Sequence, residues 1–184
     1  METYDPHNVG RRIARGRSHS VYRYGANEVI RSERLELFLG RRAADRLERD
    51  IFVCKKYLGD YVPNTRFVRH PESGRLATIQ PYIEGHALSK NDLLDPEVKR
   101  QFEDFLRRLD TMTRDGYAPV DLMGQGGVFR RRLSNIMVLP DKRIRLFDVA
   151  ILDAAGLEFA RPILWLLRHY VHRRQMAIIR YFLA

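Results

Sequence analysis

The sequence predicts an α+β fold in two lobes. Segments that read as strands cluster early in the chain around a single helix, whereas helical patterns dominate later. A short hairpin of strands interrupts the later helices. With 184 residues, the chain is long enough for one domain, or for one domain in two small lobes. We expect a β-rich N-terminal lobe over residues 1–84 and a mainly helical C-terminal lobe over residues 85–184.

The first lobe is expected to begin with three strands. Residues 9–31 alternate apolar and polar side chains in V-Y-R-Y and E-V-I-R, with glycine-containing turns between them. A helix should follow and end at Gly59, because apolar residues recur there every three or four positions. These residues are Ala44, Leu47, Ile51, Cys54 and Leu58. Two more strands are expected within residues 64–71 and 75–83.

The second lobe is expected to be mainly helical. Residues 83–97 read as a loop, and Pro96 then opens a helix that Gly116 closes. The apolar face of this helix contains Val98, Phe102, Phe105, Leu109 and Met112. A long loop leads to a hairpin over residues 133–149, which turns at Pro140-Asp141-Lys142. A terminal helix should pack on the preceding one through Ile163, Leu164, Leu167, Tyr170 and Val171.

The composition points to anionic partners. The chain has 33 Lys and Arg against 23 Asp and Glu, a net charge of +10, which favours nucleotides, nucleic acids or acidic membrane surfaces. The single cysteine, Cys54, excludes an internal disulfide and a cysteine-based zinc site. No segment resembles a signal peptide or a spanning helix, so we expect a cytoplasmic protein, with peripheral attachment to a membrane as an alternative.

The order of these elements resembles the protein-kinase-like fold in a compact bacterial form. The motifs that carry the resemblance are RIARGRSHSVY, EVIR, TIQPYIEG, LSNIMV and IRLFD, and they lie within residues 9–153. The resemblance implies a phosphotransferase that uses ATP and Mg²⁺. Only 36 residues follow Asp148 in this 184-residue chain, so we expect a reduced C-terminal lobe. A small-molecule or lipid-linked acceptor then fits better than a protein substrate.

The resemblance places the phosphate contacts in the first lobe. Three small residues lie where the family has the glycines of its phosphate-covering loop: Gly16, Ser18 and Ser20. Arg31 lies at the position of the family's lysine, which bridges the phosphates and an acid on the next helix. That acid would be Asp50, with Glu48 as the alternative. An ordinary hairpin and a surface arginine would explain the same residues without a ligand.

The resemblance also implies an adenine contact and a metal site. Gln80 and Tyr82 lie in the linker whose backbone contacts the adenine ring in kinases, although a structural strand and turn explain them equally well. Asn135 and Asp148 occupy the two ends of the hairpin, where the family holds Mg²⁺. Magnesium prefers oxygen ligands and often takes only one or two from protein. Otherwise Asn135 is a turn residue and Asp148 the end of a strand.

The sequence departs from the family at the catalytic base. Five positions before Asn135, where kinases have an aspartate, this chain has Arg130, which cannot accept a proton. Either Asp121, which lies in the glycine-rich loop before Arg130, takes that role, or the protein is a nucleotide-binding pseudokinase.

A non-enzymatic binding module is the competing hypothesis. Such a module would use its positive charge on nucleic acid or on an anionic membrane surface, the latter through the arginine-rich C-terminal helix. Nucleic acid is the less favoured of the two partners, because the sequence contains none of the common nucleic-acid-binding motifs.

Overall fold

The computed structural model describes residues 2–15, 19–33, 41–117, 122–123, 132–147 and 161–184. The chain forms two compact units, and each is described by itself. The first unit contains Met1–Phe52 and Pro63–Ile83, and the second contains Val53–Val62 and Glu84–Ala184. The sequence-based boundary after residue 84 did not anticipate that residues 53–62 belong with the second unit. The predicted α+β class is confirmed.

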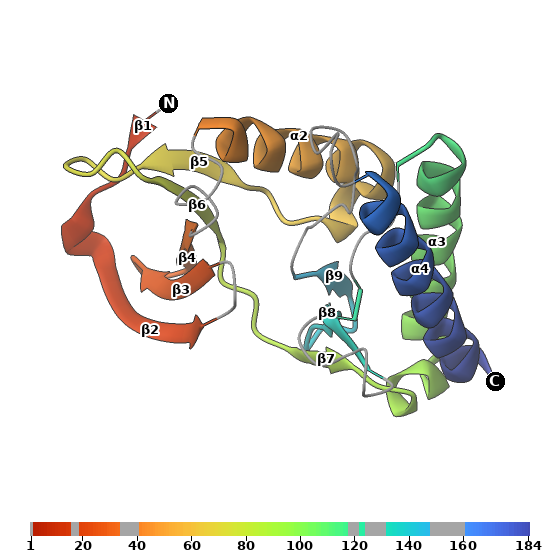
Figure 1. Cartoon of the computed structure of the whole chain (residues 1–184). Coiled ribbons are helices and arrows are strands. Elements are labelled where there is room, and N and C mark those ends of the chain that lie inside the picture. The colour runs from red at the N-terminus through yellow and green to blue at the C-terminus, as the bar shows by residue number, and fades with distance from the viewer. Residues whose placement is uncertain (1, 16–18, 34–40, 118–121, 124–131, 148–160) are drawn as a thin grey trace. The chain divides into compact units, whose positions relative to one another are not determined.

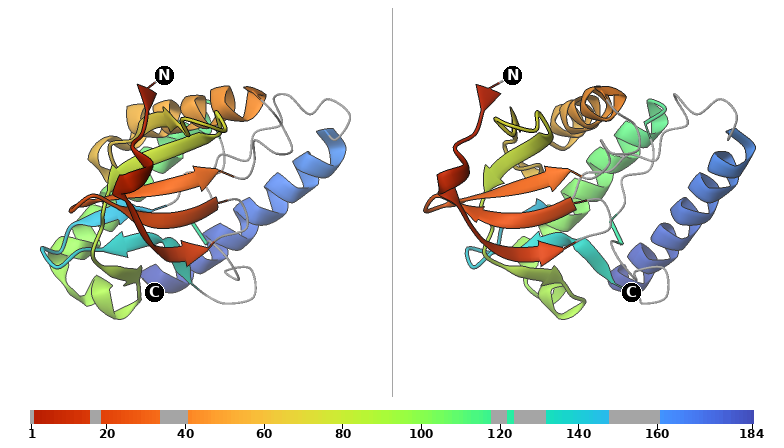
Figure 2. Two further views of the ribbon diagram at one scale, coloured as in Figure 1. Left: turned by 90° about the vertical axis from the view of Figure 1, so that its left-hand side faces the viewer. Right: turned by 60° about the vertical axis from the view of Figure 1, so that its left-hand side comes forward.

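A six-stranded sheet dominates the first unit. Its strands are β1 (Glu2–Thr3), β2 (Val9–Arg15), β3 (His19–Tyr24), β4 (Glu28–Glu33), β5 (Arg66–Arg69) and β6 (Leu76–Pro81). They lie in the order β1-β5-β6-β4-β3-β2, and Figure 2 shows β2, β3 and β4 side by side. β1 pairs in parallel with β5, and the other neighbours are antiparallel. The two-residue strand β1 and the 3-10 helix η1 (Pro6–Asn8) after it were not predicted.

The core of the first unit lies on this sheet. Ile30, Val68, Ala77 and Ile79 form a buried cluster, and four partly buried residues pack against it: Tyr4, Val9, Tyr22 and Tyr24. β6 lies between β5 and β4, so both of its hydrogen-bonding edges are paired, and its residues 76–80 are all buried. The first part of helix α2 (Arg41–Leu58) also belongs to this unit.

A three-stranded antiparallel sheet forms part of the second unit. Its strands are β7 (His86–Leu88), β8 (Leu133–Val138) and β9 (Ile144–Leu146), in that order (Figure 1). The predicted hairpin of β8 and β9 is confirmed, and Lys142 in its turn has a left-handed φ of 66°. The prediction of a loop over residues 83–97 is wrong. That segment contains β7 and the 3-10 helix η3 (Asn91–Leu94), and the three residues of β7 are too few to show an alternation.

Gly85 allows β7 to approach β8 closely. A Cβ added there would overlap the carbonyl oxygen of Val138 and would lie 3.2 Å from the carbonyl carbon. Glycine therefore occupies this position because no side chain fits between the two backbones.

Helix α3 (Pro96–Arg114) confirms the predicted pattern. All five residues of its predicted apolar face are buried, and Asp95 caps its N-terminus by accepting from the N–H groups of Glu97 and Val98. The last part of α2 packs in the same unit, with Cys54 and Leu58 fully buried. As predicted, α2 ends at Gly59, whose φ of 60° suits glycine; the short 3-10 helix η2 (Gly59–Tyr61) follows. The Tyr61 hydroxyl donates to a carboxylate oxygen of Asp104 on α3, at 3.0 Å.

The predicted terminal helix is α4 (Arg161–Leu183). Its described buried residues are Gln175, Ile178, Ile179 and Phe182. The predicted packing face is wrong at Tyr170, which is 54% exposed, and the other four side chains of that face lie outside those described. None of the helices in the described ranges is both long enough and apolar enough to cross a bilayer.

Candidate functional site

Asn135 lies where three chain segments meet in the second unit. It is on β8 and only 8% exposed. Its backbone N–H donates to the carbonyl of Leu122 at 3.2 Å, and its carbonyl accepts from the N–H of Phe147 at 2.6 Å. Leu122 directly follows the predicted base Asp121, and Phe147 directly precedes the predicted metal ligand Asp148. The two aspartates lie outside the described residues, but the described sequence neighbours of both are hydrogen-bonded to Asn135.

The hairpin that carries Asn135 is fixed by its apolar pattern and by one buried glutamine. Three residues of β8 are buried: Leu133, Ile136 and Val138. The two end residues of β9, Ile144 and Leu146, are buried as well. On α3, the amide of Gln101 accepts from the N–H of Ile144 at 3.1 Å and donates to the carbonyl of Lys142 at 3.2 Å. The hairpin is therefore attached to α3 at the end opposite Asn135.

Leu122 is attached to the C-terminal helix. Its side chain is fully buried, and its N–H donates to the side-chain oxygen of Gln175 on α4 at 3.0 Å. Sequence reasoning missed Gln175. The available signal was its spacing, because positions 175, 178, 179 and 182 follow the three, four and seven pattern of one helix face. A glutamine on an otherwise apolar face indicates a buried hydrogen bond.

Three of the predicted phosphate-binding residues are buried in the first unit. Ser20, Arg31 and Asp50 are 4–6% exposed, whereas Glu48, the alternative to Asp50, is exposed. On β4, Arg31 faces Thr78 of β6 in the register. The carboxylate of Asp50 lies 3.4 Å from Arg49 and 3.9 Å from Arg46 of its own helix. Burial favours Asp50 over Glu48 as the acid, and the pairing of Arg31 with Asp50 stays a prediction.

The predicted phosphate-covering loop falls mostly outside the described ranges. Gly16 and Ser18 lie there, whereas Ser20 belongs to β3. In the register of β3 with β2, Ser20 stands opposite Arg15, the last residue of β2. The two strands that flank residues 16–18 are thus paired with each other, as the prediction of a loop between two strands requires.

The side chains of Gln80 and Tyr82 have partners within the first unit. The amide of Gln80 donates to the Thr65 hydroxyl at 2.8 Å, and Gln80 is only 5% exposed. The guanidinium of Arg23 lies over the ring of Tyr82, 3.3 Å from its centroid. Both side chains therefore contribute to the structure of this segment, and any nucleotide contact in it is expected from the backbone.

The hydrogen bonding of residues 80–83 narrows which backbone groups can contact a ligand. The N–H of Tyr82 donates to the carbonyl of Asn27 at 2.8 Å, so this amide is already engaged. Gln80 lies two residues before Tyr82, so its backbone N–H points toward β4 as well. Pro81 has no N–H. The carbonyl of Pro81, the last residue of β6, points to the opposite side, away from β4.

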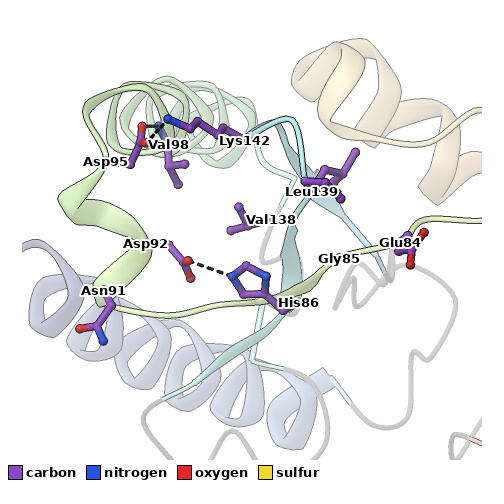
Figure 3. A pocket seen from close by; sticks show the side chains of 11 residues that line it. Glu84, Gly85, His86, Asn91, Asp92, Asp95, Val98, Val138, Leu139 and Lys142 are labelled. Atoms are coloured by element: carbon purple, nitrogen blue, oxygen red, sulfur yellow. Dashed lines mark hydrogen bonds and ion pairs between the residues drawn. The ribbon is translucent and has the colours of Figure 1, made fainter.

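One pocket of about 530 Å³ lies in the second unit, and it contains none of the predicted site residues (Figure 3). Polar side chains that line it pair with each other: His86 with Asp92 at 2.8 Å and Lys142 with Asp95 at 2.7 Å. Burial raises the pKa of Asp92, but hydrogen bonds from Ser89 and His86 outweigh it, and the pKa is lowered. The hydrogen bond from Lys142 is the main cause of the lowered pKa of Asp95. Among the described residues, no group of three or more His, Cys, Asp or Glu side chains is arranged to hold a metal ion.

Comparisons with known proteins identify the fold. No protein-family model and no curated protein sequence matches the chain. Among solved structures, the Legionella pneumophila Lpg2603 kinase bound to IP6 matches with a TM-score of 0.57 and 13% identity, over 94% of this chain and 58% of that one. The apo form of PpkA-294 matches with a TM-score of 0.53 and 14% identity, over 80% of this chain and 60% of that one. The chain thus spans less than two thirds of either structure, and its protein-kinase-like fold is confirmed.

Proposed function

We propose that this protein is a kinase-like phosphotransferase that uses ATP and Mg²⁺. One observation supports this proposal above the others: Asn135 hydrogen-bonds through its backbone to Leu122 and to Phe147. These residues are the direct sequence neighbours of Asp121 and Asp148. A base and two metal ligands of a kinase-like site must lie close together, and the hydrogen bonds between Asn135 and the neighbours of the two aspartates support this arrangement.

The residues fit a magnesium ion. Asn135 offers an amide oxygen and Asp148 a carboxylate, which are the hard oxygen ligands that Mg²⁺ prefers. Asn135 is mostly buried on a strand that is hydrogen-bonded on both sides, so its position is well fixed. When bound, the ion would offset the negative charge on the phosphates of ATP. Asn135 and Asp148 would hold it.

The first unit would hold the nucleotide. The carbonyl of Pro81 would accept a hydrogen bond from the adenine ring, because it points away from β4, and the N–H of Ile83 would donate one. Arg31, with Asp50 as its partner, would contact the phosphates. The loop of Gly16 and Ser18, together with Ser20 at the start of β3, would cover them through backbone N–H groups.

Asp121 would act as the base. Its carboxylate would accept the proton of the acceptor hydroxyl while that oxygen forms a bond to the γ-phosphorus. The bond from the γ-phosphorus to the bridging oxygen would break, and ADP would leave with the bonding electrons.

Calorimetric titration with Mg·ATP tests the metal site. We expect binding to the wild type and a loss of at least about tenfold in affinity for Asp148→Ala, because a carboxylate ligand is removed. Asp60→Ala is the matched control, since that side chain is 97% exposed, and its affinity should equal that of the wild type. Absence of binding by the wild type, or equal binding by Asp148→Ala, would contradict the metal-site assignment.

A turnover assay separates an enzyme from a pseudokinase. ADP release from Mg·ATP, with water as the acceptor, should be measurable in the wild type and should fall by roughly 10²-fold or more in Asp121→Asn. Mg·ATP binding should be unchanged in that variant. A wild type that binds Mg·ATP without releasing ADP would be a pseudokinase, and undiminished turnover in Asp121→Asn would remove Asp121 as the base.

We also propose that α4 contacts an anionic small molecule or membrane surface. The helix contains no aspartate or glutamate, and two of its arginines, Arg173 and Arg180, are exposed. The chain as a whole carries a net charge of +10. The neighbouring Lpg2603 structure contains IP6, a highly anionic ligand, which is in keeping with this charge pattern. Cationic helices of this composition bind anionic lipid headgroups and phosphates.

Vesicle sedimentation tests this contact. The protein should sediment with vesicles that contain anionic lipid but not with neutral ones, and the double variant Arg173→Gln/Arg180→Gln should sediment less. Competition by soluble IP6 would indicate a free phosphate ligand rather than a membrane. Binding of RNA or DNA on filters, steeply reduced by salt, would favour a nucleic-acid module instead. Equal sedimentation of the double variant would contradict the proposal.

A further inference from the structure

Gln175 is a buried polar residue on an otherwise apolar helix face. It is 2% exposed, and the other described buried residues of α4 are Ile178, Ile179 and Phe182. A primary amide in such surroundings costs free energy unless it is hydrogen-bonded. Its presence therefore indicates a polar partner, to which an apolar residue at this position could not bond.

That partner is the backbone of the segment next to the proposed base. The side-chain oxygen of Gln175 accepts from the N–H of Leu122 at 3.0 Å. The carbonyl of the same residue, Leu122, accepts from the N–H of Asn135. One peptide segment is thus held from both sides, by α4 through a side chain and by β8 through its backbone.

The row of hydrogen bonds extends to Phe147, the sequence neighbour of the second proposed metal ligand, Asp148. After Asn135, the next bond runs from the N–H of Phe147 to the Asn135 carbonyl at 2.6 Å. The row therefore reads Gln175, Leu122, Asn135, Phe147. Only its first member is a side chain, and hence only this member can be changed by substitution without altering the backbone itself.

We propose that Gln175 is a positioning residue for phosphoryl transfer. It fixes the backbone of Leu122, the residue that directly follows the proposed base Asp121 in the sequence, against Asn135. This inference rests on the proposed function, because it assigns Gln175 a role in that same site. A misplacement of about 1 Å in a catalytic group can lower a rate by roughly 10²-fold, so one buried hydrogen bond is sufficient to control turnover.

Two variants of Gln175 and one control test the proposal. Gln175→Leu is of similar size but has no acceptor, whereas Gln175→Glu retains an acceptor oxygen at the same place. Tyr61→Phe is the control: it removes hydroxyl hydrogen bonds to α3 in the same unit and leaves Leu122 untouched. Each variant is assayed well below its melting temperature for ADP release at varied Mg·ATP and for amide hydrogen exchange in peptides that contain Leu122.

We expect Gln175→Leu to lower kcat roughly ten- to hundredfold with little change in KM for Mg·ATP, and to speed exchange at the Leu122 amide. Gln175→Glu should recover most of kcat. Tyr61→Phe should lower the melting temperature and leave kcat within about twofold.

Two kinetic results would overturn the inference while leaving the proposed function intact: an unchanged kcat in Gln175→Leu, or a fall in kcat that Tyr61→Phe matches. Unchanged exchange at Leu122 in Gln175→Leu would also overturn it. A wild type without ADP release would instead remove the proposed function, and this inference with it.

Discussion

Gly85→Ala is expected to destabilise the second unit, because the added methyl group has no space. The new Cβ would overlap the carbonyl oxygen of Val138 and would lie 3.2 Å from its carbonyl carbon and 3.5 Å from the Cα of Leu139. All three atoms are backbone, so no rotamer change can relieve the contact. The chain at Gly85 and the end of β8 would have to separate.

The magnitude follows from two opposing effects. Overpacking of this kind typically costs ~1–3 kcal/mol. Alanine also restricts the unfolded chain more than glycine does, which recovers ~0.4–1 kcal/mol. The net loss in the free energy of unfolding is therefore about 1–2 kcal/mol, and with a urea dependence of ~2 kcal/mol per molar the midpoint should fall by about 0.5–1 M.

Urea unfolding followed by far-UV circular dichroism measures this loss. Gly10→Ala is the control, because its Cβ would lie 3.2 Å from a side-chain atom, the Cβ of Arg23, and overlap no backbone. Because alanine restricts the unfolded chain at this position too, the Gly10→Ala midpoint should equal that of the wild type or rise by up to about 0.5 M. A Gly85→Ala midpoint that is not below that of the wild type would refute the argument that a backbone contact excludes a side chain here.

Three further predictions concern stability. Gln101→Leu should lower the free energy of unfolding by about 1–3 kcal/mol, because the N–H of the fully buried Ile144 loses its acceptor; unchanged urea unfolding would contradict this. Asp95→Ala should lower the melting temperature at neutral pH, because α3 loses its N-cap and Lys142 loses its ion pair; an unchanged melting temperature would contradict this. Burial and the hydrogen bond to an aspartate raise the pKa of Tyr61 to about 12, above its usual value near 10. The stabilisation by Tyr61 is thus complete below pH 10 and is lost as the pH rises toward 12, so Tyr61→Phe should show a shallower loss of stability over that interval; equal slopes would exclude this contribution.

Much of the fold could be predicted because its patterns are local. The apolar face of α3 was readable from residues three and four positions apart, and the turn after β8 from its Pro140-Asp141-Lys142 sequence. β1 and β7 could not be predicted, since two- and three-residue strands exist only through their partners β5 and β8. Such pairing is tertiary information.

The candidate site was partly readable for the same reason. The position of Asn135 on a strand of the hairpin followed from the sequence, and its burial agrees with a fixed role. The contacts of Leu122 with Asn135 and Gln175 could not be predicted, because they join segments 13 and 53 residues apart, as positions 122, 135 and 175 indicate. The choice between Asp50 and Glu48 likewise depended on knowing which side chain is buried, because the helical spacing alone leaves both candidates open.

The complete burial of Cys54 gives the protein an intrinsic reporter of local unfolding. The chain has no other thiol, and this one is 0% exposed on the part of α2 that belongs to the second unit. A thiol reagent can react only in molecules whose α2 has transiently come away from its surroundings. The rate of that reaction, compared with the rate of an unfolded peptide, therefore yields the free energy of this opening without any engineered label.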